Sequence, residues 1–164
     1  MQVGKILAIA LRSRHLGPMI EAQQVTAVAN GCLQDDHGSS QRRGLTLLSS
    51  TQWQHVSNEL GVDLPWHTRR ANVLVEAPTL APLIGKKIRI DRPRSGQVGA
   101  PQAAARNDAI VRVQIHAETK PCSEMDEFHP GLKDALVPDC RGGVYGKILD
   151  SGQIQVGDYI VVES

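Results

Sequence analysis

Short apolar runs divided by glycine and proline constrain this fold more than any other feature of the sequence. The 164 residues include 15 glycines and 9 prolines. Few of the apolar runs between them show the 3.6-residue period of a helix, and short apolar runs bounded by turn residues are typical of β-strands. The sequence therefore predicts a mainly β fold, a closed or partly open β-barrel with a few short helices.

Candidate strands follow one another along most of the chain. The predicted strands cover residues 3–11, 25–29, 44–48, 69–75, 86–90, 110–115, 141–149 and 153–162. Short helical turns are expected at residues 79–84 and 130–136. A longer helix is predicted at residues 50–60, because Ser49 and Gln52 match a capping box and Trp53, Val56 and Leu60 share one helical face.

Residues 92–107 interrupt this succession of strands. They are rich in Pro, Gly, Ala and Arg, a composition that is typical of a flexible connection. We interpret them as an insertion that joins two strands of one domain spanning residues 1–164. A chain of this length with 41% hydrophobic residues is long enough to bury its own core.

Charge and composition exclude several classes of function. The formal net charge is +1 and only 3% of residues are aromatic, so neither a broad polyanion-binding surface nor a stacking platform for nucleic acid is expected. The apolar run near the start is too short to span a bilayer. Cys32, Cys122 and Cys140 are widely spaced and form no metal-binding pair. We expect a cytoplasmic monomer that binds no membrane, with Cys140 either packed in the core or a resolving thiol for Cys122.

Cys122 is the candidate reactive residue. It follows a proline, and Lys120, His116 and His129 are close in the sequence. These cations would favour the nucleophilic thiolate if the fold brings them near the sulfur. A free cysteine is more often a buried apolar residue. The polar neighbours of Cys122 are typical of loops, however, so we interpret Cys122 as catalytic and Lys120 as its assisting cation.

Basic residues at strand entrances form the candidate anion site. Two arginine pairs, Arg42 with Arg43 and Arg69 with Arg70, each precede an apolar run. Adjacent arginines are usually solvated, but two pairs at equivalent strand starts can line one rim of a barrel and bind phosphate. Arg141 precedes two glycines in a similar position.

Two further groups of residues have both a structural and a functional interpretation. Gly142 and Gly143 permit a close approach of the backbone to an anion, although paired glycines also bend barrel strands. Asp35 and His37 lie in a polar loop, where their residue types first suggest an ordinary turn.

Taken in order, these motifs resemble the MOSC domain, named for the C-terminus of molybdenum cofactor sulfurase. The matching residues are Gly31, Asp35, His37, Arg42-Arg43, Arg69-Arg70-x-Asn72, Lys120-Pro121-Cys122, Arg141-Gly142-Gly143 and Gly152-x-Ile154-x-x-Gly157-Asp158. The resemblance covers nearly the whole chain. It implies a barrel similar to the β-barrel domain of pyruvate kinase.

The resemblance also implies function. Cys122 would receive sulfane sulfur as a persulfide from a cysteine desulfurase, a pyridoxal phosphate enzyme, and would deliver it for cofactor assembly. Alternatively, Cys122 would ligate molybdenum in a reductase component that acts on N-hydroxylated compounds with an electron-transfer partner. A non-catalytic module that binds a phosphorylated ligand is a third hypothesis. This chain itself is not expected to bind pyridoxal phosphate.

The resemblance assigns the molybdenum cofactor to the polar motifs. Its pterin phosphate would be bound by residues drawn from the basic motifs, and Asn72 would orient the pterin ring by hydrogen bonds. The residues assigned to the cofactor are Asp35, His37, Arg42, Arg43, Arg69, Arg70, Asn72, Arg141, Gly142 and Gly143.

Overall fold

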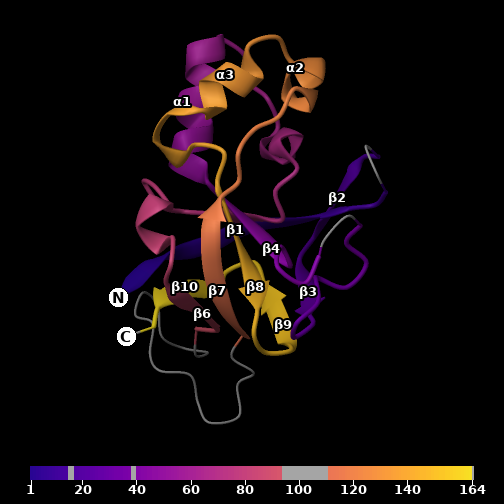
Figure 1. The fold of residues 1–164 in the computed structure, drawn as a ribbon, viewed down its shortest axis with the longest axis vertical. Coiled ribbons are helices and arrows are strands. Elements are labelled where there is room, and N and C mark those ends of the chain that lie inside the picture. Colours follow the sequence, from indigo (N-terminus) through magenta and orange to yellow (C-terminus); the bar gives the residue numbers. More distant parts are fainter. Residues whose placement is uncertain (15–16, 38–39, 94–110, 164) are drawn as a thin grey trace.

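The structure is a computed structural model that describes residues 1–14, 17–37, 40–93 and 111–163 (Figure 1). Most of the predicted insertion at 92–107 lies outside the described residues. Of its residues the structure describes Arg92, whose Nε lies 3.2 Å from Asp158 Oδ1, and Pro93.

A closed β-barrel forms the body of the described chain. Its strands are β1 (Gln2–Arg12), β4 (Leu45–Ser49), β5 (Val73–Val75), β6 (Lys87–Asp91), β7 (Val111–Glu118), β8 (Val144–Ile148) and β10 (Tyr159–Val162). Their order around the barrel is β10-β6-β7-β8-β4-β5-β1, and pairing of β1 with β10 closes the sheet. The pairing of β4 with β5 is parallel, and the other barrel pairings are antiparallel. The mainly β prediction is confirmed.

Three further strands lie outside the closed ring. The short β2 (Met19–Ala22) continues the sheet beyond β1, while β3 (Gln24–Ala27) pairs with β9 (Gly152–Gln155) in a separate two-stranded sheet. The sequence analysis missed β2. Its two central residues, Ile20 and Glu21, are both exposed, so no apolar alternation marks it as a strand.

Aliphatic side chains fill the barrel because each strand alternates between an inward and an outward face. In β7, Val111, Val113 and Ile115 are fully buried, and the residues between them are partly exposed. The strand extends three residues beyond the predicted end at 115, to Glu118. This extension carries the chain out of the barrel toward Cys122.

Helices gather at one end of the barrel, at the top of Figure 1. They are α1 (Ser50–Leu60), α2 (Glu124–Phe128) and α3 (Leu132–Leu136), with the 3-10 turns η1 (Trp66–Arg69) and η3 (Pro138–Cys140) next to them. A further 3-10 turn, η2 (Ala81–Leu83), lies beside the barrel, below this end (Figure 1). The Ser49 half of the predicted capping box is confirmed, since the backbone N–H of Gln52 donates to Ser49 Oγ at 3.2 Å. The side chain of Gln52 instead donates to the Asp139 carbonyl oxygen at 2.7 Å. None of the helices in the described ranges has both the length and the apolar character that a membrane span requires.

A second apolar cluster joins these helices to the barrel. Trp53 and Val56 of α1 pack with Met125 of α2 and Leu132 of α3, and Leu48 of β4 contributes from the barrel side. The helices therefore form a cap that is attached through its own core. The space between this cap and the barrel end contains the candidate site.

Candidate functional site

A pocket of about 220 Å³ lies where the cap meets the barrel end. The end of β1, the start of β4, the turn η1, the segment after β7, the helix α2 and the residues before β8 all contribute to its wall. The lining residues are Arg12, Arg43, Thr46, Arg69, Arg70, Ala71, Thr119, Lys120, Cys122, Glu124, Met125 and Gly142. We call it the cationic pocket.

Arg69 is the buried cation of this pocket, with only 7% of its surface exposed. Its Nε donates to the carbonyl oxygen of Gly142 at 3.0 Å, and its Nη2 donates to that of Thr119 at 2.8 Å. Its Nη1 lies 3.7 Å from the sulfur of Met125. These contacts orient the guanidinium but contribute no negative charge.

Burial acts against the charge on Arg69. Loss of hydration lowers the pKa of Arg69 to about 10. Coulombic interaction with Cys122 and Glu118 raises this pKa, and repulsion from Arg43 lowers it. The guanidinium remains protonated at neutral pH. The pocket therefore contains a desolvated positive charge that has no ion-pair partner among the described residues, an arrangement that costs free energy until an anion binds.

Arginines without a carboxylate partner are concentrated around this pocket. Five arginines form ion pairs within the described residues: Arg12, Arg89, Arg92, Arg112 and Arg141. Those with no described carboxylate oxygen within 4.0 Å are Arg14, Arg42, Arg43, Arg69 and Arg70. Three of the latter, Arg43, Arg69 and Arg70, line the pocket.

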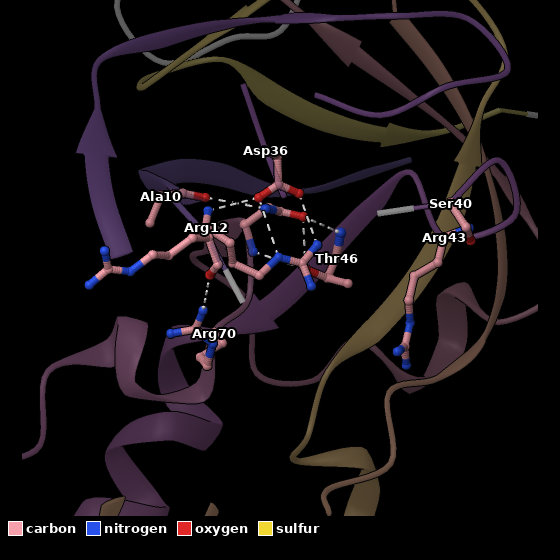
Figure 2. Close-up of polar contacts among 9 residues, drawn as sticks. Ala10, Arg12, Asp36, Ser40, Arg43, Thr46 and Arg70 are labelled. Atoms are coloured by element: carbon pink, nitrogen blue, oxygen red, sulfur yellow. Dashed lines mark hydrogen bonds and ion pairs between the residues drawn. The ribbon is translucent and has the colours of Figure 1, made fainter. Parts of the chain in front are cut away.

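Arg12 and Arg70 form one wall of the pocket. Arg12 Nη2 lies 2.8 Å from Asp36 Oδ2, and Figure 2 shows this ion pair together with Arg43 and Arg70. Arg70 has a left-handed backbone (φ 65°), and its Nη1 donates to the Gly17 carbonyl oxygen at 2.6 Å. Burial, followed by repulsion from Arg12, lowers the pKa of Arg70. The sequence analysis missed Arg12, whose place at the end of the first strand was its one available signal.

Cys122 lies at the mouth of the pocket and is exposed. Its carbonyl oxygen accepts a hydrogen bond from the backbone N–H of Met125 at 3.0 Å, which fixes it at the start of α2. Lys120 and Glu124 line the pocket on either side of it in sequence. The structure thus brings Cys122 together with Lys120 at this rim, while the predicted neighbours His116 and His129 do not line the pocket.

A buried hydroxyl group inside the pocket wall also lacks a partner. Thr119 Oγ1 is buried and makes no hydrogen bond to the described residues. Buried polar groups are rarely left unpaired in native proteins. Of the described residues with such an atom, which are Gln52, Thr119 and Glu163, Thr119 is the one that lines the pocket. Thr119 was not predicted from the sequence, because a single threonine after a strand carries no distinguishing signal.

Several predicted residues lie outside the pocket lining. Asn72 is fully buried: its Oδ1 accepts from Thr46 N and Oγ1 at 3.1 and 3.0 Å, and its Nδ2 donates to Ala10 O at 3.3 Å. Figure 2 labels Thr46 and Ala10 in this network. Asn72 therefore ties β1 to β4 and has no group directed at the pocket. Arg141 Nη1 lies 2.8 Å from Glu59 Oε2 on the side of α1.

The remaining predicted residues divide between the pocket and its surroundings. Gly142 lines the pocket, and a side chain there would collide with the Thr119 carbonyl oxygen. Gly143 lies behind the wall, where its carbonyl oxygen accepts from Thr119 N at 2.8 Å. Asp35, His37 and Arg42 do not line the pocket.

The other cysteines do not share the position of Cys122. Cys140 is buried, and burial raises the pKa of its thiol to about 11, so the thiol is protonated at neutral pH. Its Sγ lies 3.5 Å from the Gly143 carbonyl oxygen. Cys32 is half-buried in the loop after β3. These placements favour packing for Cys140 over a role as a resolving thiol.

Metal binding at this site would depend on the thiol of Cys122. In the described part of the chain, no three His, Cys, Asp or Glu side chains gather in a way that could hold a metal ion. A metal held mainly by its own organic ligand, with one protein thiolate, needs no such cluster. The donor set therefore fits a cofactor anchored through an anionic group in the cationic pocket and through Cys122.

Comparisons with known proteins identify the family and the fold. The model of the MOSC domain family matches residues 33–161. Among solved structures, the YuaD protein from Bacillus subtilis is 17% identical with a TM-score of 0.70, and the match covers 96% of this chain and 93% of that one. YiiM from Escherichia coli is 12% identical with a TM-score of 0.63, covering 98% and 70% of the two chains. YiiM from Geobacillus stearothermophilus is 14% identical with a TM-score of 0.61, covering 100% and 75%. These likenesses show a shared fold, and no curated protein sequence matches.

Proposed function

Because the chain belongs to the MOSC domain family, we propose that it is a sulfur-carrier protein that binds a phosphorylated molybdenum-pterin type cofactor beside Cys122. One observation carries this proposal: an exposed thiol lies at the mouth of a pocket whose buried Arg69 has no described carboxylate partner. The thiol is accessible to a partner protein. The pocket offers charge to an anionic ligand.

Sulfur transfer to Cys122 is an exchange at a sulfane sulfur. The Cys122 thiolate attacks the outer sulfur of a persulfide on a cysteine desulfurase, the S–S bond of the donor breaks, and the donor thiolate leaves with the electron pair of that bond. The chain then carries the sulfur as a Cys122 persulfide. Attack by an acceptor thiolate on the same sulfur restores the Cys122 thiolate, so neither step needs an external oxidant.

The pocket residues have two roles in this proposal. Arg69, Arg70 and Arg43 bind the phosphate of the cofactor, because guanidinium groups pair with phosphate through charge-assisted hydrogen bonds. The buried Thr119 hydroxyl donates to the same ligand. Lys120, at the exposed rim, stabilises the negative charge of the Cys122 sulfur during exchange. When bound, the cofactor supplies a metal centre that accepts or exchanges sulfur and oxygen ligands.

Persulfide loading tests the proposal. The chain is incubated with a pyridoxal phosphate-dependent cysteine desulfurase and L-cysteine, and its intact mass is measured under non-reducing conditions. We expect the wild type and Cys140→Ser to gain the mass of one sulfur atom, and Cys122→Ser to gain none. Equal loading of Cys122→Ser at another cysteine would overturn the proposal.

A reductase component is the second candidate function, with Cys122 as a permanent ligand of molybdenum and N-hydroxylated compounds as substrates. The position of Cys122 supports it, since Cys122 lines the pocket in which the cofactor would be bound. Metal analysis of the purified chain separates the two. Stoichiometric molybdenum that Cys122→Ser lacks indicates a permanent bond from the thiolate to the metal and supports the reductase. A chain that is purified without metal, accepts sulfur and binds the cofactor only transiently supports the carrier. If the wild type accepts no sulfur, and if Cys122→Ser binds phosphate as tightly as the wild type does, the chain is a non-catalytic binding module.

A further inference from the structure

A group of basic residues continues from the cationic pocket onto the outer face of the barrel. Arg43 belongs to the pocket lining, and its Cζ lies 4.8 Å from the centre of the Tyr145 ring. The ring of His116 is 6.3 Å from the same ring, centre to centre. Arg42 adjoins Arg43 in the chain, and Lys147 lies on the same outward face of β8 as Tyr145. Both lower the pKa of His116 by repulsion. We call Arg42, Arg43, His116, Tyr145 and Lys147 the basic strip.

The strand register places this strip beside the pocket. Tyr145 pairs with Ala117, and Lys147 pairs with Gln114, in the antiparallel ladder of β8 with β7. The register shifts between Ile115 and Ala117, so His116 is the extra residue of a bulge. A β-bulge redirects a side chain and often lies near a functional site. Here the bulge places the imidazole of His116 beside the ring of Tyr145.

The basic strip carries positive charge that no carboxylate of the described residues pairs with. No carboxylate oxygen of the described residues lies within 4.0 Å of Arg42, Arg43 or Lys147. By contrast, Arg112, on the same strand as His116, is bonded to Asp150 at 2.7 Å. Burial first, then repulsion from Arg42 and Lys147, lowers the pKa of His116. An anion bound among these groups would relieve that repulsion.

Arg43 connects the two sites. Its guanidinium is fixed against Tyr145 by a cation–π contact and also faces the pocket that contains Arg69. We propose that the ligand carries two linked phosphate groups, one bound at Arg69 in the cationic pocket and the other bound at Arg42 and Lys147 on the basic strip. This inference rests on the proposed function, because it names the class of the anion that the pocket binds: a diphosphate-bearing molecule.

Calorimetric binding of inorganic phosphate and pyrophosphate at constant ionic strength tests the inference. We expect pyrophosphate to bind the wild type about tenfold more tightly than phosphate does, as two charge-assisted contacts are added. In the double variant Arg42→Gln/Lys147→Gln this preference is lost, and phosphate affinity changes less than about twofold. The matched control, Lys5→Gln/Lys87→Gln, removes two exposed charges elsewhere on the barrel and retains the preference.

A second measurement reports on the strip directly. The imidazole pKa of His116, followed by NMR, should rise when pyrophosphate binds and should stay unchanged when phosphate binds. Two results would overturn this inference and leave the proposed function standing. One is a preference for pyrophosphate that survives in the double variant, and the other is a His116 pKa that pyrophosphate does not change. Phosphate binding that is absent, or that Arg69→Gln does not weaken, would instead overturn the anion site of the proposed function.

Discussion

Phosphate should stabilise the native chain through Arg69, and the size of this effect is set by the phosphate concentration relative to the dissociation constant. The pKa of Arg69 falls from 12.5 to about 10, mainly because its guanidinium loses hydration. This difference corresponds to about 3 kcal/mol of unfavourable free energy for the charged form in the native state. An anion that pairs with the guanidinium offsets this cost.

The expected stabilisation is therefore measurable as a shift in the unfolding temperature. Phosphate at one hundred times its dissociation constant stabilises the native state by about 2.7 kcal/mol, which is similar to the cost of burying the charge. In a chain of this size, each kcal/mol of added stability raises the midpoint temperature of unfolding by about 2–4 °C, so the expected rise is about 5–10 °C.

Differential scanning calorimetry in phosphate and in chloride, at equal ionic strength, measures this rise. The variant Arg69→Gln should lose it, because the buried charge is gone. Arg112→Gln is the matched control, since Arg112 is paired with Asp150 away from the pocket, and it should keep the full rise. An equal rise in Arg69→Gln and in the wild type would refute the assignment of Arg69 as the anion-binding cation.

Three further substitutions test the structure around the site. Gly142→Ala should destabilise the chain by about 1–3 kcal/mol in urea unfolding and should abolish the phosphate response, because its methyl group meets the Thr119 carbonyl oxygen. Asn72→Ala should cost about 2–3 kcal/mol, since Thr46 loses its acceptor, yet the phosphate affinity of the folded protein should be unchanged. Burial raises the pKa of Asp158 above 3.8, so the native state binds an extra proton and the free energy of unfolding should fall as pH rises from 3.8 through the raised pKa. Asp158→Asn should flatten this slope in a pH series of urea unfolding curves.

Local signals in the sequence predicted the elements that local forces determine. The helix α1 begins and ends as expected because Ser49 supplies the cap and Gly61 takes the left-handed conformation (φ 66°). The alternation in β7 fixed which of its residues face the core. The polar neighbours of Cys122 indicated a loop, and the structure places this residue on the surface.

The orientation of individual arginines was beyond the sequence, because it depends on contacts between distant segments. Arg42 and Arg43 are adjacent, yet only Arg43 lines the pocket. Arg69 is buried because the missing side chain of Gly142, more than seventy positions away, leaves room for its guanidinium. Asn72 shows the converse: a polar residue beside two arginines matches a ligand-binding pattern, but its amide is used to join strands.

The way in which Arg69 is held explains why it suits anion binding better than a surface arginine. A flexible arginine loses about 2 kcal/mol of side-chain conformational entropy when a ligand orders it. The Gly142 and Thr119 carbonyl oxygens already fix the Arg69 guanidinium, so this cost is met when the chain folds. Because carbonyl oxygens orient the group without neutralising it, its full charge remains available to the pocket. The same contacts that make Arg69 unfavourable for stability therefore prepare the site for an anion beside Cys122.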